Sequence, residues 1–210
     1  MTKVLVTCGS TREYIDPVRF LSNGSSGKMG LAIVEGLLEY GFEPVIVSGP
    51  VSICYPAGVE VYFVESTLEM LSCCVSLFGS CKGIISAAAP CDFKPKQFSP
   101  QKITKPASGS GITIELEQTK DILAELGKIK KLNQWSVGFA LETQNEKQNA
   151  LAKLKQKNCD LIIINSPNAI NNNHTKLKIY NTQKKLIKTL NGTKKIIGKK
   201  LVKIIIDNLK

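Results

Sequence analysis

The chain has only one histidine, His174, among its 210 residues. Because this residue lies in a polar, asparagine-rich segment, we do not expect histidine-based catalytic triads or metal clusters. The seven cysteines are odd in number and contain no C-x-x-C pair, and the sequence shows no secretory signal. A disulfide framework or a zinc site is therefore not expected, and a reducing cytoplasm is the expected location.

Long apolar runs are also lacking. No stretch approaches the roughly 20 residues needed to span a bilayer, so we expect a soluble protein. Aromatic residues make up only 6% of the sequence, and no known nucleic-acid-binding motif is present. These two absences argue against a nucleic-acid-binding module, although they do not explain the charge of the chain.

Positive charge is concentrated in the second half of the sequence. Residues 1–119 contain 9 Lys/Arg and 11 Asp/Glu, a net −2, whereas residues 120–210 contain 19 and 6, a net +13. A basic half can attract nucleic acid, but it can equally attract a small polyphosphate. Most of these lysines can also simply form a solvated face.

Apolar periodicity predicts alternating strands and helices. Strands are expected at 3–7, 44–50, 59–66, 83–89, 112–118, 136–142 and 160–166. Helices are expected over about 27–40 and 66–77, after a Thr119 cap, after a Thr143–Glu146 capping box, and from about 193. The tail contains two strand-like runs, 176–182 and 184–190. Such alternation is typical of an α/β fold with a mostly parallel, Rossmann-like sheet and helices on both faces.

We expect one domain over residues 1–210. About twenty residues without periodicity, roughly 90–111, are unusual inside a compact domain unless the loop has a task, and we interpret them as a mobile lid. A C-terminal extension resembling a β-hairpin is expected over about 172–210. In parallel sheets, ligands bind beyond the carboxyl ends of the strands, so the segments to inspect are 8–30, 88–105, 139–143 and 165–171.

The segment SNGSSGKMG, residues 22–30, spaces three glycines at intervals of three before a helix. Glycine permits tight turns and close backbone approach, and a helix N-terminus attracts anions. The segment is not a P-loop, because Ser22 stands where that motif has its first glycine and Met29 stands where it has Ser or Thr. It is not a G-x-G-x-x-G motif either, because its first two glycines are too far apart. Close packing of helix against strand is the competing explanation.

Asp92 follows the predicted strand 83–89, at the edge where a ligand is expected. It can equally be an ordinary turn residue. Lys102 and Lys105 lie in the predicted lid, where they suit phosphate clamping as well as plain solvation. Cys91 is a possible nucleophile, but no base is evident beside it and packing is the favoured interpretation.

Together these segments resemble the bacterial phosphopantothenoylcysteine synthetases, the phosphopantothenate–cysteine ligases of coenzyme A synthesis. The resemblance is carried by TREYIDPVRFLSNGSSGKMG (11–30), SAAAPCDFKP (86–95), KITK (102–105), GFALET (138–143), AKLKQK (152–157) and INS (164–166). These motifs occur in order along nearly the whole chain. Many relatives carry a flavin-dependent decarboxylase upstream, whereas Met1 directly precedes the first strand here, so the chain is either a standalone ligase or a fragment.

The resemblance implies a two-step reaction. CTP activates the carboxylate of 4'-phosphopantothenate as an acyl-cytidylate, releasing pyrophosphate, and the amine of L-cysteine then displaces CMP. Magnesium is the implied metal, with Asp92 as its candidate ligand, and the family associates as homodimers. A separate decarboxylase is a possible partner, and neither nucleic acid nor a membrane is expected to bind.

The resemblance also implies roles for individual residues. Asn23 would hold the acyl group and its activated intermediate, and Lys102 would support activation. Arg19 would steady either the loop that carries Asn23 or the substrate phosphate. The implied nucleotide-binding residues are Gly9, Ser25, Gly27, Gly30, Asp92, Lys102, Phe139, Lys153, Lys157 and Asn165, and the implied substrate-binding residues are Arg19, Asn23, Ala88, Ala89 and Asp92.

Some positions depart from the family pattern, and two other functions stay open. Thr104 stands where the family commonly has lysine, Pro90 and Cys91 replace small apolar residues, and Ser166 replaces an aspartate. A nicotinamide-dependent reductase is the main alternative, although Ser48-Gly49 stands where its ribose-binding acidic residue is expected. A non-catalytic basic module that binds nucleic acid is the third possibility.

Overall fold

The computed structural model describes residues 1–106, 109, 111–165 and 172–209. Its strands are β1 (Lys3–Cys8), β2 (Arg12–Tyr14), β3 (Phe20–Ser22), β4 (Glu43–Ser48), β5 (Glu60–Phe63), β6 (Gly83–Ser86), β7 (Phe93–Pro95), β8 (Leu116–Gln118), β9 (Trp135–Leu141), β10 (Leu161–Asn165), β11 (His174–Asn181) and β12 (Leu186–Thr193). Its helices are α1 (Lys28–Glu39), α2 (Thr67–Phe78), α3 (Ile122–Ile129), α4 (Glu146–Gln156) and α5 (Lys194–Leu209).

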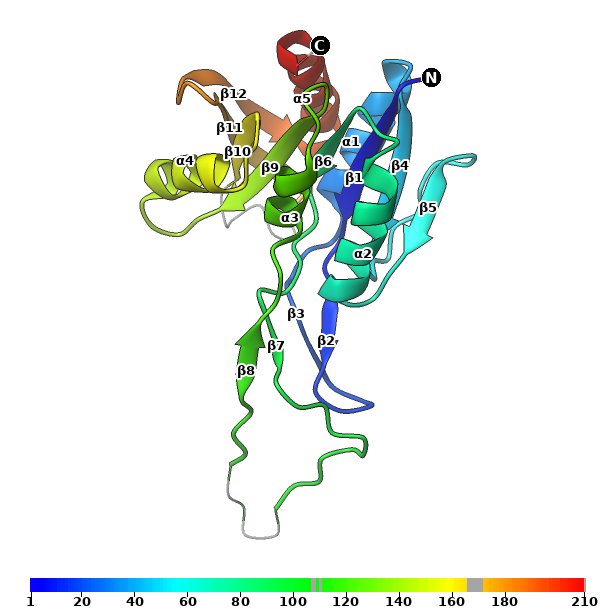
Figure 1. The fold of residues 1–210 in the computed structure, drawn as a ribbon, viewed down its shortest axis with the longest axis vertical. Helices are drawn as coiled ribbons and strands as arrows, with labels where there is room; N and C mark the ends of the chain where they lie inside the picture. The colour runs from blue at the N-terminus through cyan, green and yellow to red at the C-terminus, as the bar shows by residue number, and fades with distance from the viewer. Residues whose placement is uncertain (107–108, 110, 166–171, 210) are drawn as a thin grey trace.

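One sheet of eight strands organises the molecule, in the order β12-β11-β10-β9-β6-β1-β4-β5 (Figure 1). Strands β5, β4, β1, β6, β9 and β10 pair in parallel, whereas β11 and β12 continue the sheet antiparallel. The mostly parallel α/β sheet expected from the alternating pattern is confirmed. The predicted C-terminal extension forms its last two strands.

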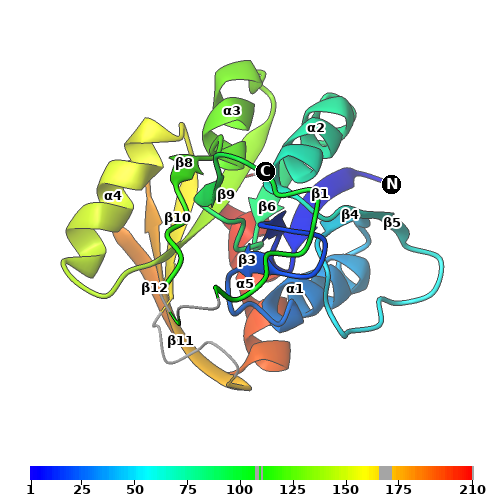
Figure 2. The same cartoon turned by 90° about the horizontal axis from the view of Figure 1, so that it is seen from below.

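Helices cover both faces of this sheet, with α1 and α5 on one side and α2, α3 and α4 on the other (Figure 2). Successive side chains of a strand point to opposite faces. In β1, Val4 and Val6 accordingly pack with α1 and α5, while Leu5 packs with α2. Burial on both faces explains why the central strands are continuous apolar runs rather than alternating ones.

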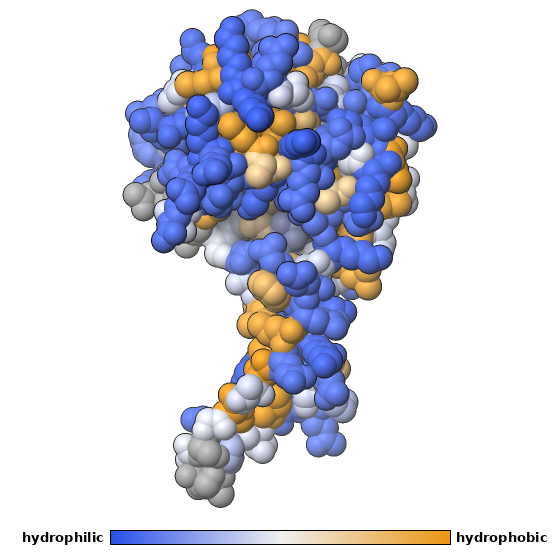
Figure 3. Space-filling model, turned by 60° about the vertical axis from the view of Figure 1, so that its left-hand side comes forward, coloured by the Kyte–Doolittle hydropathy of each residue, from blue (hydrophilic) through white to orange (hydrophobic). Residues whose placement is uncertain are grey.

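Two antiparallel hairpins, β2–β3 and β7–β8, project away from the sheet (Figure 1). We call their segments, residues 12–22 and the described part of 93–118, the arm. Apolar side chains gather along its surface (Figure 3). The large apolar residues exposed on it are Val18, Phe20, Phe93, Phe98, Ile112, Ile114 and Leu116.

Several local predictions were wrong. The strand predicted over 112–118 is only β8, and it lies in the arm rather than in the large sheet. Asp121, not Thr119, caps α3 by accepting the Ala124 N–H at 3.0 Å. The hydroxyl of Thr119 is engaged elsewhere, since it donates to the Cys91 carbonyl at 2.6 Å.

The second predicted capping box, Thr143–Glu146, is absent. Helix α4 begins at Glu146 and its N-cap is Asn145, which has a left-handed backbone (φ 48°) and no side-chain cap bond. Asparagine tolerates this conformation better than most residues. The box at Ser66–Glu69 is confirmed, because the Glu69 N–H donates to the Ser66 hydroxyl at 3.2 Å and the Glu69 carboxylate accepts the Ser66 N–H.

Candidate active site

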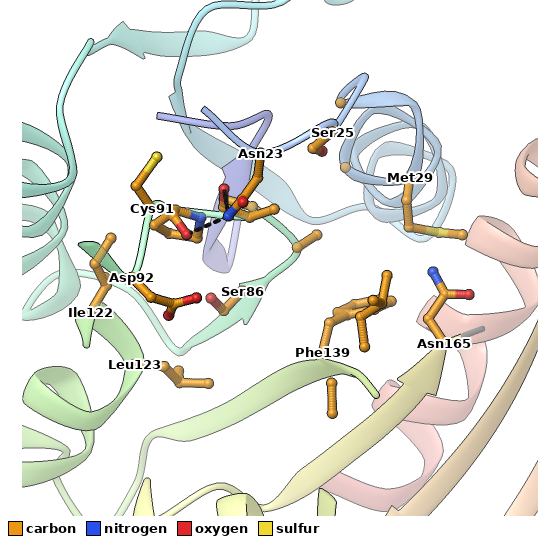
Figure 4. A pocket seen from close by; sticks show the side chains of 18 of the residues that line it. Asn23, Ser25, Met29, Ser86, Cys91, Asp92, Ile122, Leu123, Phe139 and Asn165 are labelled. Atoms are coloured by element: carbon orange, nitrogen blue, oxygen red, sulfur yellow. Dashed lines mark hydrogen bonds between the residues drawn. The ribbon is translucent and has the colours of Figure 1, made fainter. Parts of the chain in front are cut away.

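A cavity of about 450 Å³ lies beyond the carboxyl ends of β6, β9 and β10. Its described lining comes from residues 23–30, 86–92, 119–123 and 139–141 and from Lys153, Lys157, Asn165 and Lys194. The predicted segments around 22–30 and 86–92 therefore meet in one site, and Asn23 and Asp92 share it (Figure 4). This is the edge at which parallel sheets bind ligands.

The glycine segment forms the loop that enters α1. Gly27 is the N-cap of this helix and has a left-handed backbone (φ 73°) without a side-chain cap bond. Gly30 lies so close to the Cys8 side chain that a Cβ atom would collide with its sulfur. Two of the three glycines thus serve the two explanations offered by the sequence, because Gly27 turns the loop into the cavity and Gly30 allows helix α1 to approach β1.

Gly9 supports the opposite loop from outside the cavity. Its carbonyl accepts the Ala89 N–H at 2.8 Å, and Thr7 accepts the Ala88 N–H through its hydroxyl at 3.2 Å. These bonds fix the backbone of Ala88 and Ala89, both of which line the cavity. Among the described residues, Gly9 is a supporting residue rather than part of the cavity lining.

Asn23 joins the two loops. Its side-chain amide donates to the carbonyl oxygens of Pro90 at 2.9 Å and Ala89 at 3.3 Å. The backbone carbonyl of Asn23 accepts the Ser25 N–H at 2.9 Å, which tightens the turn into the glycine segment. The side chain is exposed to the cavity, as Figure 4 shows, beside Cys91 and Asp92.

Cys91 is a packing residue in this geometry. It is 5% exposed, and its thiol lies 3.5 Å from the carbonyl oxygens of Thr11 and Leu21. Burial raises the pKa of the Cys91 thiol, so the nucleophilic thiolate is disfavoured. Its neighbour Asp92 is exposed instead, with its carboxylate facing the interior of the site (Figure 4).

Lys153 and Lys157 lie one helical turn apart at the end of α4 and both line the cavity. Lys153 forms an ion pair with Glu142 and Lys157 forms one with Asp121, each at 2.7 Å. Phe139 lies within β9 and Asn165 is the last residue of β10, both on the wall opposite Asp92 (Figure 4). Asn165 is oriented by Thr175, whose hydroxyl donates to its Oδ1 at 2.6 Å.

Arg19 and Lys102 lie in the arm and are not part of the described cavity lining. The Arg19 guanidinium donates to Asp16 at 2.6 Å and to the Ile103 carbonyl at 3.0 Å. The fully buried Asp16 also accepts the Ile103 N–H at 3.1 Å. Arg19 therefore steadies the loop next to Lys102, which is exposed.

Several cavity residues escaped the sequence analysis. They include Lys28, Lys120, Asp121, Ile122, Leu123 and Lys194. The loop before α3 carries no glycine-rich or other phosphate-binding pattern. Lys194 lies in a lysine-rich tail, where no sequence feature singles it out from the other lysines. Ser166, a departure noted in the sequence, lies outside the described residues.

The described residues contain no group of three or more His, Cys, Asp or Glu side chains that could hold a metal ion. Asp92 alone is compatible with Mg²⁺, since this ion is often bound through one carboxylate together with substrate phosphates. None of the described helices is both long and apolar enough to cross a membrane.

The family model described as "DNA/pantothenate metabolism flavoprotein C-terminal domain" matches residues 1–209. The chain belongs to this family. The resemblance found in its motifs is confirmed, as is the α/β fold. Its curated relatives include the coenzyme A biosynthesis bifunctional protein CoaBC of Bacillus subtilis, 43% identical over 167 residues, which are 79% of this chain and 40% of that protein.

A second relative, named cysteine/cysteine sulfinic acid decarboxylase and from an unknown prokaryotic organism, is 47% identical over 167 residues, 78% of this chain and 45% of the relative. The chain thus spans less than half the length of these two relatives. Among solved structures, the C-terminal domain of a CoaBC protein superposes with a TM-score of 0.83 at 36% identity, covering 97% of this chain and 93% of that one.

Proposed function

We propose that this chain is a phosphopantothenate–cysteine ligase that uses CTP and Mg²⁺. The observation that carries the proposal is the contact of Asn23 with the 89–90 backbone, because it brings the family's two central motifs together around one cavity. Family membership and the CoaBC relatives support a role in coenzyme A biosynthesis.

In the first step, a carboxylate oxygen of 4'-phosphopantothenate attacks the α-phosphorus of CTP, and the bond to the leaving pyrophosphate breaks. The site suits this chemistry through its charges. Lysines line the cavity, and the amide-rich loop at Gly27 faces the same space. Such preorganised cations and N–H groups stabilise developing phosphate charge without a protein nucleophile.

In the second step, the amine of L-cysteine attacks the acyl carbon and CMP leaves. Asn23 lies at the junction of the two loops, where an amide can both donate and accept hydrogen bonds. We propose that it holds the acyl group in this step. Asp92 would hold Mg²⁺, whose chemistry is to offset phosphate charge.

The proposal is tested by incubating the protein with phosphopantothenate, cysteine, Mg²⁺ and CTP, ATP or UTP in turn. Pyrophosphate and a new thiol amide should form together, and fastest with CTP. Pyrophosphate without the amide would limit the activity to acid activation. Neither product with any nucleotide would contradict the proposal.

A parallel titration with NADPH tests the alternative reductase. At the end of β4, where a ribose-binding acid is expected, the Ser48 hydroxyl pairs with the Tyr55 hydroxyl at 2.8 Å. Gly49 follows, and a Cβ atom there would collide with the Ser10 carbonyl. This geometry gives the reductase no support.

The homodimer and a decarboxylase partner, fused or separate, stay proposals based on the family. Light scattering tests the first directly. A homodimer has twice the chain mass of 22.9 kDa, and a mass of a single chain at micromolar concentration would contradict it.

A further inference from the structure

Thr67, the first residue of α2, has a buried hydroxyl that helix α2 does not use. The residue is 2% exposed and is not part of the described cavity lining. Ser66 is the N-cap of the helix, and the Glu13 carboxylate accepts the Thr67 N–H at 2.7 Å. Since the start of α2 is already capped, the position of the Thr67 hydroxyl is to be explained by what else it contacts.

The Thr67 hydroxyl belongs to a closed ring of hydrogen bonds around Cys91. It donates to the Cys91 carbonyl at 3.3 Å, and the Cys91 N–H donates to the hydroxyl oxygen of Thr11 at 2.8 Å. The two threonine hydroxyl oxygens lie 2.8 Å apart. A hydroxyl has a single proton, so with the Thr67 proton on Cys91 the Thr11 hydroxyl donates to Thr67. Both backbone groups of Cys91 are thereby held.

The peptide groups on either side of Cys91 lead to the two central residues of the cavity. A peptide group is planar, so the Cys91 N–H shares a plane with the Pro90 carbonyl, which accepts the Asn23 amide at 2.9 Å. The Cys91 carbonyl shares the next plane with the N and Cα atoms of Asp92. Holding this carbonyl therefore sets the direction in which the Asp92 side chain leaves the backbone and enters the site (Figure 4).

Thr119 holds the second of these planes as well. Its hydroxyl donates to the Cys91 carbonyl at 2.6 Å, and its N–H donates to the Asp92 carbonyl at 3.0 Å. A carbonyl oxygen has two lone pairs, so Thr119 and Thr67 together use the acceptor capacity of Cys91. Loss of the Thr67 hydroxyl would leave a single side-chain donor on this oxygen, and the peptide group would turn toward it.

We propose that Thr67 is a positioning residue for Asp92. Its hydroxyl, oriented by Thr11, fixes the peptide group from which the Asp92 carboxylate reaches a nucleotide in the cavity. This inference rests on the proposed function for the identity of the nucleotide, and it adds to the site a residue that the ligand does not touch.

A double-mutant cycle on CTP binding in the presence of Mg²⁺ tests the proposal. Asp92→Asn should weaken binding about tenfold, because a charged contact is lost. Thr67→Val keeps the size of the side chain and removes the hydroxyl, and it should weaken binding about threefold or more. In the Asp92→Asn background the same change should weaken binding by less than about twofold, because the carboxylate that it misplaces is gone.

Two further variants serve as controls for the loss of the hydroxyl. Thr67→Ser keeps this group and should bind CTP within about twofold of the unaltered protein. Thr189→Val makes the same chemical change as Thr67→Val at an exposed position of β12 and should leave CTP affinity unchanged. If circular dichroism shows that Thr67→Val does not fold, Thr119→Val takes its place, since it removes the other hydroxyl from the Cys91 carbonyl.

The coupling between the two positions decides the inference. An equal loss of CTP affinity in both backgrounds, unchanged binding in either single variant, or failure of Thr67→Ser to restore affinity would each overturn it. The expected coupling in a protein that forms no amide from phosphopantothenate and cysteine would overturn the proposed function and leave the role of Thr67 standing.

Discussion

At the scale of single residues, a substitution of Asn23 can separate the two proposed steps. Asn23→Asp replaces only the side-chain amide nitrogen by an oxygen. We expect Asn23→Asp to keep pyrophosphate formation while transfer to cysteine falls about a hundredfold, as when one stabilising donor is lost. A carboxylate cannot donate to the Pro90 and Ala89 carbonyls and brings negative charge near the acyl group. Separate assays of pyrophosphate release and amide formation measure the effect.

The control for this substitution is Asn208→Asp, on the exposed last turn of α5. It makes the same chemical change far along the chain from the cavity motifs and should leave both steps unchanged. An equal loss of both steps in Asn23→Asp would show that Asn23 has no separate role in transfer.

Asp16 is a residue whose protonation is coupled to the stability of the arm. Burial alone raises its pKa, but hydrogen bonds from the Val18, Arg19 and Ile103 amides and from the Arg19 guanidinium outweigh this effect and lower the pKa to about 2. Since its ordinary value is 3.8, the carboxylate stabilises the fold above about pH 4. This contribution is lost as the pH falls toward 2.

Asp16→Asn should therefore be less stable than the unaltered protein at neutral pH, and the difference should shrink between about pH 4 and pH 2. Urea unfolding of both proteins across this range measures it. A stability difference that stays constant with pH would mean that the charge of the Asp16 carboxylate does not stabilise the arm.

At the scale of elements, the contact between α1 and α5 keeps Lys28 and Lys194 on one wall. A Cβ atom at Gly198 would lie 2.5 Å from the Ala32 carbonyl carbon and oxygen. We expect Gly198→Ala to force the helices apart and to lower the free energy of unfolding by about 1–3 kcal/mol. Chemical denaturation followed by circular dichroism measures the change.

Gly79→Ala is the matched control, because Gly79 has a right-handed helical backbone and nothing within 4 Å of an added Cβ. Its effect should stay within about 0.5 kcal/mol. If Gly198→Ala proved equally harmless, the helices would be more loosely packed than this geometry requires.

The elements that the sequence predicted well are those whose signals are local. Buried β-branched runs such as residues 3–7 and 160–166 mark central strands, and Ser66 with Glu69 marks a helix start. The Thr119 cap failed because the tertiary contact with Cys91 takes its hydroxyl. The arm was missed because short hairpins such as β2–β3 lack a long periodic pattern.

In the candidate site too, residues with a local sequence signal were predicted, whereas residues placed by tertiary packing were not. Asn23, Asp92 and the lysines of α4 belong to motifs and were predicted as site residues, and the structure places them around one cavity. Lys194 could not be singled out, since its position depends on α5 packing against α1 and on Asn173. Only the folded chain distinguishes it from its exposed neighbour Lys195.

At the scale of the whole molecule, a role for Lys102 in activation requires the arm to come close to the cavity at the edge of the large sheet. Lys102 is exposed on the arm and does not belong to the described cavity lining, while the next residue, Ile103, is held by Asp16 and Arg19. The lysine can thus act only after approach of the arm to a cavity, in this chain or in another copy. Asp16 fixes the backbone from which it would reach.

We expect Lys102→Gln to slow pyrophosphate release about tenfold or more, because a cation that offsets developing phosphate charge is lost. Transfer of a preformed acyl-cytidylate to cysteine should continue at its normal rate. Lys96→Gln is the control on the same arm, since the Lys96 charge is already offset by Glu115. Rapid-quench measurement of both steps decides the matter, and unaltered pyrophosphate release would mean that the arm does not take part in activation.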